Sequence, residues 1–568
     1  MGMEATDASA ARPLRVALLL DSYVVPRWVH QVVGDLQRSG IAQVVLVVKN
    51  EGVAPAAPAG RSLWRKVADN RRRLLEIAYT RLDDRLFGRD GDPFGRVDVT
   101  PLVGDCPTVA VTPRMTKFCD YFDDADVEAI RRHDVDVALR FGFRILKGGA
   151  LRIARFGVWS YHHGDNLVNR GGPPGFWEVM EGHPVTGSVL QVLTEELDGG
   201  QVIYRSHAPT DRLSVRRNKA NFYWKSSAFL LRKLRDLHRE GACALRDPLP
   251  DADAWRAYSN RLYTSPTNAE VARGVARIAG HYVGQKLRRL YELDQWVLAY
   301  KLNKGSSTPD VPDPTLYRYR PIIPPKDRFW ADPFPVVHEG RHFVFLEEFL
   351  YRTGKAHISV MELGPDGAWT TPVPVLERDY HLSYPFVFRW EGEWYLIPES
   401  GANRTVELYR AVEFPHRWVL DRVLLDGVHA VDATLTEIDG VWWMFVNVAV
   451  PGASTWDELH LYHAPTPLGP WTPHHRSPVK SDVRNARPAG RIFRHGGAWY
   501  RPAQDCSVRY GYSIVINRIE RLTLEEYREV PVSTIYPRWL PNTVGTHTIN
   551  AAGGLTVVDA WMKRPKYR

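Results

Sequence analysis

The stretch "YPFVFRWEGEWYLIPES" (Tyr384–Ser400) sets the pattern for the second half of the chain. Apolar and aromatic residues flank a central Glu391-Gly392 pair, as in two strands joined by a tight turn. A two-residue turn that contains glycine is typical of a β-hairpin. The same shape recurs in four more segments, which are "DPFPVVHEGRHFVFLEE" (Asp332–Glu348), "DATLTEIDGVWWMFVN" (Asp432–Asn447), "RPAGRIFRHGGAWYRPAQD" (Arg487–Asp505) and "HTINAAGGLTVVDAW" (His547–Trp561).

The turn glycines of these segments recur at intervals of 48 to 57 residues, at Gly340, Gly392, Gly440, Gly497 and Gly554. A repeat of about fifty residues with four strands in each copy is the period of a propeller blade. Five copies therefore predict an all-β five-bladed propeller over residues 291–568. A β-sandwich is the main alternative, but a sandwich does not require such regular spacing.

The first part of the chain has a different pattern. "RVALLL" (Arg15–Leu20) and "AQVVLVVKN" (Ala42–Asn50) are continuous apolar runs, and a helix-like segment with Pro26 near its start lies between them. Continuous apolar runs are typical of strands buried on both faces of a parallel sheet. We therefore expect a multidomain chain with a Rossmann-like α/β domain over 14–242, a helical connector over 243–290, and the propeller.

Composition limits the function classes. The net charge of +9 is arginine-led and dispersed along the chain, whereas a nucleic-acid-binding protein gathers its positive charge on one face. The four cysteines show no CxxC or His/Cys ligand spacing, so neither a zinc site nor a disulfide framework is expected. No apolar run reaches the length of a membrane span. We expect a cytoplasmic protein without metal, nucleic acid or stable membrane insertion.

A dense polar loop, "SYHHGDNLVNRGG" (Ser160–Gly172), follows a predicted strand of the α/β domain. In open parallel sheets, ligands bind beyond the carboxyl ends of the strands. Asp198 lies on a later glycine-flanked turn, "TEELDGGQV". A histidine that is hydrogen-bonded to a carboxylate suits proton transfer and the stabilisation of an oxyanion at an acyl carbon. The pair formed by His162 and Asp198 is therefore the candidate catalytic pair.

The segment from "RFGFRILKGG" to "LDGGQVI" resembles the folate-dependent formyltransferases. The family pattern is Asn-x-His, Arg-Gly eight residues after the histidine, Thr-Gly, and Leu-Asp-x-Gly. His162, Arg170-Gly171, Thr186-Gly187 and Asp198 fit that pattern, and the resemblance covers roughly residues 14–210.

The resemblance implies that an amine attacks the formyl carbon of 10-formyltetrahydrofolate, the expected formyl donor. His162 then stabilises or protonates the oxyanion, and Asp198 orients His162 and assists proton removal. Ser160 stands where the family has asparagine, and Asn166 or His163 are candidates for that role. The expected substrate-binding residues are His163, Arg170, Gly171, Thr186 and Gly187.

The residues that open the five hairpins are expected to converge near the axis of the propeller: Asp332, Tyr384, Asp432, Arg487 and His547. Glu399, in "IPES", is a third carboxylate, and all six residues are the candidate ligand-binding residues of the propeller. This placement of carboxylates resembles the five-bladed arabinanase- and xylosidase-type glycosidases. A closer resemblance, over about 320–540, is to the N-terminal domain of glucosamine inositolphosphorylceramide transferases. It rests on "HLSYPFVF", "ELYRAVEFPHRW", "LGPWTPH", "SPVKSDVRNARPAGRIF" and "RPAQDCSVRYGYSI".

Three functional hypotheses follow. In the first, the α/β domain transfers a formyl group to the amine of an amino sugar or nucleotide sugar, and the propeller binds this small-molecule carbohydrate. In the second, the transferase domain is degenerate, which Ser160 favours, and the chain is a glycan-binding protein. In the third, the propeller carries glycoside hydrolase or glycosyl transfer activity through Asp332, Asp432 and Glu399.

Overall fold

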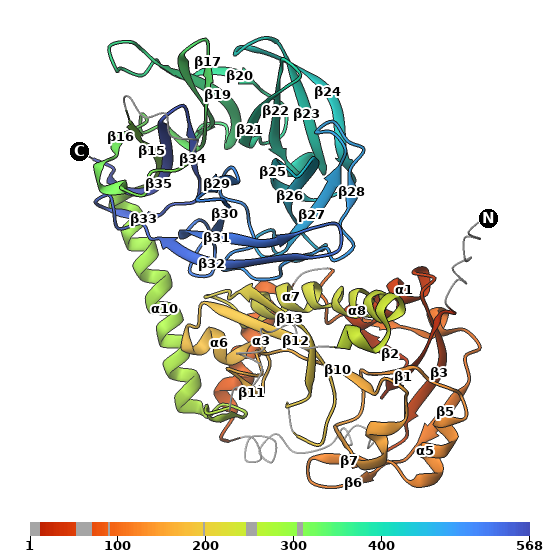
Figure 1. Ribbon diagram of the computed structural model, residues 1–568. Helices are drawn as coiled ribbons and strands as arrows, with labels where there is room; N and C mark the ends of the chain where they lie inside the picture. Colours follow the sequence, from red (N-terminus) through yellow and green to blue (C-terminus); the bar gives the residue numbers. More distant parts are fainter. Residues whose placement is uncertain are drawn as a thin grey trace, which may run out of the picture. The chain divides into compact units, whose positions relative to one another are not determined.

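The computed structural model describes residues 12–52, 71–88, 91–196, 199–245, 258–303 and 311–567. The chain divides into two compact units (Figure 1). Unit 1 comprises Met1–Ser206, Thr210–Ile278 and Pro451–Ala453, and unit 2 comprises His207–Pro209, Ala279–Val450 and Ser454–Arg568. The division falls inside helix α10 (Asn268–Tyr291), within the segment expected to be a helical connector.

Unit 1 is built on a seven-stranded sheet. Its strands, in spatial order, are β13 (Gln201–Pro209), β12 (Val185–Val192), β10 (Val158–His162), β8 (Val137–Arg140), β1 (Leu14–Leu20), β3 (Ala42–Asn50) and β5 (Thr108–Val111). The pairs β3–β5, β1–β3, β1–β8 and β8–β10 are parallel, whereas β10 and β12 are antiparallel. The chain runs outward from β1 to β5 and then returns to the other side of β1, so the strand order reverses between β1 and β8.

Strand β1 is buried on both faces, as its apolar run predicts. Val16, Leu18 and Leu20 pack into one core together with the apolar faces of helices α1 (Arg27–Arg38) and α8 (Phe229–Glu240). Ala17 and Leu19 pack into a second core with helix α5 (Asp124–Arg131). Successive side chains of a strand point to opposite faces of its sheet, and here both faces are covered.

In the described part of unit 1, the remaining elements are four α-helices and seven short strands. The helices are α3 (Leu74–Phe87), α4 (Thr100–Val103), α6 (Phe176–Glu181) and α7 (Val215–Ser226). The strands are β2 (Val24–Pro26) with β4 (Arg96–Asp98), β6 (Arg114–Met115) with β7 (Cys119–Tyr121) and β9 (Ile145–Lys147), and β11 (Arg170–Gly171) with β14 (Leu262–Tyr263).

The sequence predicts one long helix where the structure has α7 followed by α8. The break lies at Ser226 and Ser227, whose hydroxyls donate to the backbone carbonyls of Tyr223 at 3.0 Å and Trp224 at 2.7 Å. Serine hydroxyls that bond back to the preceding turn compete with the helical backbone pattern and bend helices. Two of them in succession account for the interruption.

Unit 2 is mostly β, as predicted, and after the end of helix α10 its described regular elements are strands and short 3-10 turns. One sheet contains β16 (Arg320–Ile322), β15 (Glu292–Leu302), β35 (Leu555–Pro565), β33 (Thr543–Gly545) and β34 (Ile549–Ala552). Two four-stranded sheets follow along the chain: β17 (Arg328–His338), β18 (Arg341–Leu350), β19 (Lys355–Leu363) and β20 (Val373–Leu376), and then β21 (Ser383–Trp390), β22 (Glu393–Ser400), β23 (Thr405–Glu413) and β24 (Arg417–Asp426). The last two sheets are β25 (Ala430–Ile438), β26 (Val441–Val448), β27 (Leu459–Ala464) and β28 (Thr472–Pro473), and then β29 (Phe493–His495), β30 (Ala498–Asp505), β31 (Ser513–Leu522) and β32 (Tyr527–Ile535). Figure 1 shows these five sheets around a common centre.

All five predicted hairpins are antiparallel strand pairs, namely β17–β18, β21–β22, β25–β26, β29–β30 and β34–β35. In the second hairpin Glu391 has φ of 48° and Gly392 has φ of 87°. Two consecutive residues with positive φ are what a type I′ turn requires, and the second is glycine in every one of the five turns. The glycine signal in the sequence therefore has a backbone cause.

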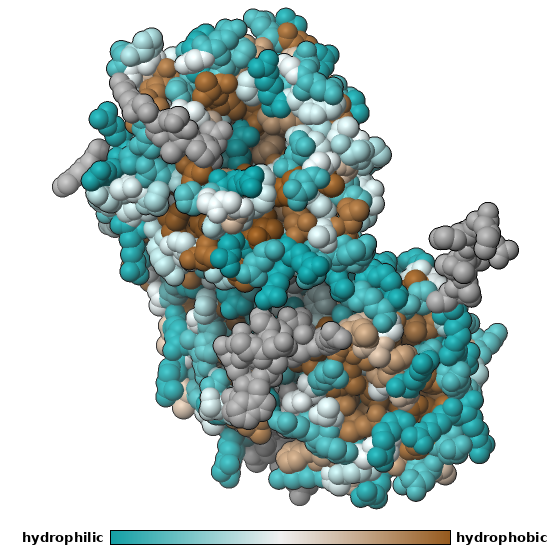
Figure 2. Space-filling view, viewed as in Figure 1, coloured by the Kyte–Doolittle hydropathy of each residue, from teal (hydrophilic) through white to brown (hydrophobic). Residues whose placement is uncertain are grey.

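Hydrophilic and hydrophobic residues are interspersed over the face shown in Figure 2. Among the described residues, no helix is long and apolar enough to cross a membrane.

Candidate functional site

His162 lies at the carboxyl end of β10 and is buried. Its Nε2 lies 2.9 Å from the backbone oxygen of Asn169. Because a carbonyl oxygen only accepts hydrogen bonds, Nε2 must carry a proton. In the neutral ring Nδ1 is then the nitrogen that bears the lone pair.

His163 does not share the side of the strand that His162 occupies. The rings of Tyr161 and His163 stack at 5.7 Å, so these two side chains lie on one face and His162 points to the other. His163 also stacks on Tyr223 at 3.8 Å, and its Nε2 lies 3.1 Å from the hydroxyl of Ser226. Burial lowers the pKa of His163 well below its usual value. The structure therefore places His163 in an aromatic cluster and not with His162.

Ser160 is buried within β10, and its hydroxyl is already engaged. It accepts a hydrogen bond from Arg140 Nε at 3.0 Å and donates to the backbone oxygen of Tyr161 at 3.3 Å. Asn166 is also buried, and its Oδ1 accepts from Arg205 at 3.0 Å. This bond turns Oδ1 of Asn166 toward the Arg205 guanidinium, so the donor Nδ2 of the same amide points away from Arg205.

Arg170 is held by three partners. Its Nε donates to the backbone oxygen of Asn166 at 3.0 Å, and its terminal nitrogen pairs with Glu196 at 2.7 Å. The guanidinium also lies over the ring of Tyr258, 4.7 Å from its centre. Gly171 has φ of 99°, and a Cβ there would lie 2.1 Å from the backbone oxygen of Tyr263. The Arg-Gly motif therefore anchors the loop through strand β11.

The Thr-Gly motif, Thr186-Gly187, is buried, and its contacts hold neighbouring segments of the chain together. The hydroxyl of Thr186 lies 2.9 Å from that of Thr210 and donates to Asn218 Oδ1 at 3.2 Å. A Cβ on Gly187 would meet Asp165 at 2.5 Å, so the motif lets the loop after β10 pack against β12. Asp198, the predicted partner of His162, lies outside the described residues.

Two residues near His162 escaped the sequence interpretation. Asn169 supplies the carbonyl that fixes His162, and its Nδ2 donates to Glu178 Oε1 at 3.3 Å. Glu178 is 3% exposed, and burial raises its pKa to about 7. A carboxyl within "FWEVM", the first five of the six residues of α6, all of them buried, was the signal available in the sequence.

In unit 2, three of the predicted axial residues share an unusual backbone. Asp332, Tyr384 and Asp432 have φ of 48°, 43° and 57°, and each sits where the strand pairing shifts register in the first strand of its hairpin. Side chains other than glycine adopt positive φ only where the surrounding structure holds them there. The same device in three successive sheets indicates a built polar centre.

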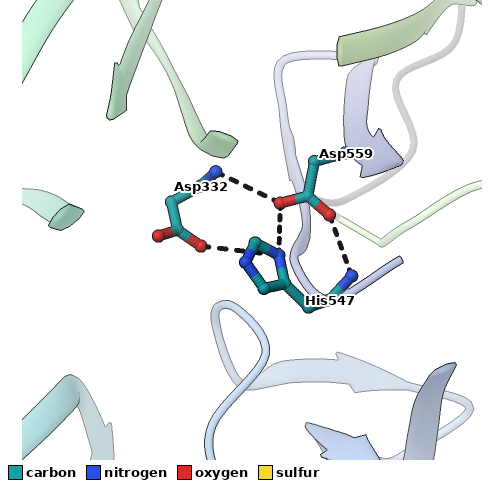
Figure 3. Close-up of side chains that lie close together, drawn as sticks. All are labelled: Asp332, His547 and Asp559. Carbon is teal, nitrogen blue, oxygen red and sulfur yellow. Dashed lines mark hydrogen bonds and ion pairs between the residues drawn. The ribbon is translucent and has the colours of Figure 1, made fainter. Parts of the chain in front are cut away.

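Figure 3 shows one half of this centre. His547 Nδ1 lies 2.5 Å from Asp559 Oδ2 and 3.8 Å from Asp332 Oδ1, and all three residues are buried. Asp559 also accepts the backbone N–H groups of Asp332, His547 and Thr548 at 2.9 to 3.1 Å. Burial alone would lower the pKa of His547, but the carboxylates of Asp559 and Asp332 outweigh it and raise this pKa to about 9.

The same three residues offer ligand atoms within 4.8 Å of one another, which is close enough for a metal ion. However, His547 is held as a cation, and Asp559 already accepts four hydrogen bonds from it and the backbone. Metal ligation requires a neutral imidazole. We therefore describe the cluster as a buried network of ion pairs and hydrogen bonds and not as a metal site. Asp559 was missed by the sequence interpretation because it lies inside a strand, not at the start of a hairpin.

Arg487 organises the other half of the centre. It donates to Asp432 Oδ2 at 2.5 Å and to Asp432 Oδ1 at 3.1 Å, and also reaches Glu399 at 3.4 Å. Burial, followed by the charge of Asp432, raises the pKa of Glu399 to about 8. The side chain of Glu399 is 16% exposed, against 7% for Arg487 and 2% for Asp432. Glu399 is therefore the member of this group most open to a ligand.

Tyr384 is fully buried, and its hydroxyl accepts from the backbone N–H of Gly490 at 2.8 Å and lies 2.8 Å from Thr434 Oγ1. Tyr384 therefore has no exposed group with which to make the ligand contact that the sequence predicts for it. Tyr510, which the sequence interpretation did not include, lies over the Arg487 guanidinium at 4.9 Å and contacts the His547 ring edge-on at 5.3 Å.

Residues 313–540 match a family described as "Glucosamine inositolphosphorylceramide transferase 1, N-terminal". The chain is 38% identical over 261 residues to glucosamine inositolphosphorylceramide transferase 1 of Oryza sativa subsp. japonica, an alignment that covers 45% of this chain and 34% of the rice protein. The chain thus spans about a third of the length of these curated relatives.

A second sequence similarity is to a methionyl-tRNA formyltransferase. The chain is 31% identical over 133 residues to methionyl-tRNA formyltransferase of Parabacteroides distasonis, covering 23% of this chain and 40% of that protein. Among solved structures, Zg3597, a family 117 glycoside hydrolase of Zobellia galactanivorans, aligns with a TM-score of 0.30 at 14% identity, over 47% of this chain and 90% of that chain. That TM-score is too low to support an inference about function.

Proposed function

We propose that unit 1 is a one-carbon transferase that moves a formyl group to the amine of an amino sugar or nucleotide sugar. The observation that carries this proposal is the arrangement of His162, which lies at the carboxyl end of β10 with Nε2 held by Asn169. A histidine fixed through one nitrogen presents the other to a substrate in one orientation. The similarity to methionyl-tRNA formyltransferase supports the same class of reaction.

In this proposal, His162 exchanges a proton through Nδ1 with the oxygen or amine of the reacting groups. General acid–base catalysis by a positioned side chain contributes about 10²- to 10⁴-fold to a rate. Asp198 assists proton removal from the amine, while Asn169 orients His162 through Nε2. 10-Formyltetrahydrofolate supplies an electrophilic formyl carbon when it is bound.

The residues present fit a formyl donor in part. His162 provides the proton-carrying group, but the hydroxyl of Ser160 is committed to Arg140 and to a backbone oxygen. We therefore assign the polar contact to the formyl oxygen to Asn166, whose Oδ1 is oriented by Arg205. Amide side chains are among the groups that form oxyanion holes. Arg170, Gly171, Thr186 and Gly187 shape the loop around this site and do not carry the chemistry.

For unit 2 we propose that the five sheets are the blades of a closed propeller that binds carbohydrate. Pairing of β15 with β35, its first and last strands, supports closure. Glu399, the most open carboxylate of the centre, and the half-buried ring of Tyr510 are the proposed sugar contacts. Asp332, Asp432, Arg487 and His547 hold these groups in place. The carbohydrate-related name of the matching family supports the ligand class.

Hydrolysis by unit 2 is the less favoured alternative. Glycosidases keep two carboxyl groups about 5 to 9.5 Å apart, on either side of the bond that is cleaved. Here one guanidinium, that of Arg487, bridges Asp432 and Glu399. A chromogenic glycoside panel tests this alternative, because turnover that is abolished in Asp432→Asn would establish it.

The assay for the proposed function mixes the full chain with 10-formyltetrahydrofolate and a panel of amino sugars and nucleotide amino sugars. Release of tetrahydrofolate that depends on the acceptor is the expected result. Absence of turnover, together with absence of folate binding by calorimetry, would overturn it in favour of a degenerate transferase domain on a glycan-binding protein.

A further inference from the structure

Glu178 and Asn169 form a buried pair in which one hydrogen bond is missing. Asn169 Nδ2 donates to Glu178 Oε1 at 3.3 Å. Among the described residues, neither Asn169 Oδ1 nor Glu178 Oε2 has a hydrogen-bond partner, and both atoms are buried. Both are acceptors when Glu178 is ionised, so neither can satisfy the other. Buried acceptors without a donor are costly, and native structures rarely keep them.

A single proton removes this deficit. A carboxylic acid has one O–H donor beside its acceptor oxygen, and a primary amide has the same two functions. A proton on Glu178 Oε2 would give the pair a donor for Asn169 Oδ1 in addition to the bond already present. The environment favours the neutral acid, because Glu178 is buried, as are Phe176, Trp177, Val179 and Met180 of the same helix.

The pair is connected to His162 through the backbone of Asn169. Its N–H donates to the backbone oxygen of Asp165 at 2.6 Å, and its side chain is held by Glu178. The backbone N–H and the side chain of Asn169 are therefore both held, and these contacts fix the position of the carbonyl that accepts the hydrogen bond from His162 Nε2. The charges that act on Glu178 are those of His162 on β10 and Glu181 on its own helix.

We propose that Glu178 is a positioning residue for His162, which holds a proton on Oε2, pairs as a neutral acid with the Asn169 amide, and so fixes the carbonyl that sets the His162 tautomer. The role of the tautomer in formyl transfer rests on the proposed function. The arrangement itself does not, and it is measurable without substrate. When Glu178 ionises, the pair loses its second hydrogen bond and a negative charge forms near His162.

The test is ¹⁵N NMR of the full chain with labelled histidine, in which the His162 signals are assigned with His162→Gln. Glu178→Gln carries an amide whose N–H permanently supplies the missing donor. Glu181→Gln makes the same substitution on the same helix and is the matched control. We expect the wild-type His162 signals to show a titration step near pH 7 that is absent in Glu178→Gln and is retained, at a lower pH, in Glu181→Gln, because the charge of Glu181 helps to raise the pKa of Glu178.

Identical His162 titrations in the wild type and in Glu178→Gln would overturn the proposal. Glu178→Leu adds a second test, because it keeps the volume of the side chain but offers no hydrogen bond. A His162 tautomer that is unchanged in Glu178→Leu would contradict the positioning role. If the formyl transfer assay fails but the titration step is lost in Glu178→Gln, the proposed function falls and this inference stands.

Discussion

The carboxylate of Asp559 accepts the backbone N–H of Asp332 at 3.1 Å, although the two residues are 227 positions apart in the chain. The same carboxylate forms an ion pair with His547. One side chain of the last strand therefore ties the start of the first hairpin to the start of the last. This connection is made at a site where every participating group is buried and hydrogen-bonded.

Asp559→Asn is expected to lower the free energy of unfolding of the full chain by about 3 to 5 kcal/mol, because it removes the nearer of the two carboxylates that face the His547 cation. Urea unfolding followed by tryptophan fluorescence measures the change. Asp439→Asn, in an exposed turn of the same unit, is the control and should unfold like the wild type. Equal midpoints for Asp559→Asn and the wild type would show that the network does not stabilise unit 2.

Gly392→Ala is expected to destabilise the chain by about 1 kcal/mol or more, because φ of 87° strains a residue with a Cβ. No atom lies within 4 Å of the position that this Cβ would take, so the cost is conformational and not steric. Gly280→Ala makes the same change inside helix α10, where it should stabilise by about 0.5 to 1 kcal/mol. Thermal unfolding of both variants tests the sign of each effect, and a neutral Gly392→Ala would refute the turn assignment.

Arg487→Met is expected to cost about 3 to 5 kcal/mol, because it leaves the Asp432 carboxylate buried without its cation. The double variant Arg487→Met/Asp432→Asn should recover part of that loss. A double-mutant cycle in urea measures the coupling between the two residues. Additive effects would mean that the bidentate contact contributes nothing to stability.

Glu178→Gln should change how stability depends on pH. Burial raises the pKa of Glu178 from 4.5 to about 7, so the folded state favours the neutral acid. The raised pKa adds roughly 3 kcal/mol to the free energy of unfolding, and this stabilisation is fully present below pH 4.5 and is lost as the pH rises through 7. The free energy of unfolding of Glu178→Gln relative to wild type should therefore rise over that range, as measured by urea unfolding at several pH values. A difference that stays flat for Glu178→Gln would contradict the account.

The sequence predicted the hairpins of unit 2 because the turns need two residues of positive φ, and glycine marks that requirement. It predicted β1 because a strand covered on both faces is apolar along most of its length, with Arg15 near the start of β1 as the exception. The opposite orientations of His162 and His163 were also predictable, since adjacent residues of a strand point to opposite faces.

Other features could not be predicted, because they depend on contacts between distant segments. Asp559 lies in an aromatic strand, and only the folded chain brings it to the backbone of Asp332. Glu178 and Asn169 meet through a helix and a loop whose relative placement no motif encodes. The engagement of Ser160 by Arg140 likewise arises from the pairing of β8 with β10.

The most direct test of the account is acceptor-dependent release of tetrahydrofolate by His162→Gln and by His133→Gln, which precedes β8 at the opposite end of the sheet. The account predicts that His162→Gln lowers kcat by about 10²- to 10⁴-fold, whereas His133→Gln is unaffected. Equal rates for His162→Gln and the wild type would contradict the central claim that His162 carries the proton in formyl transfer.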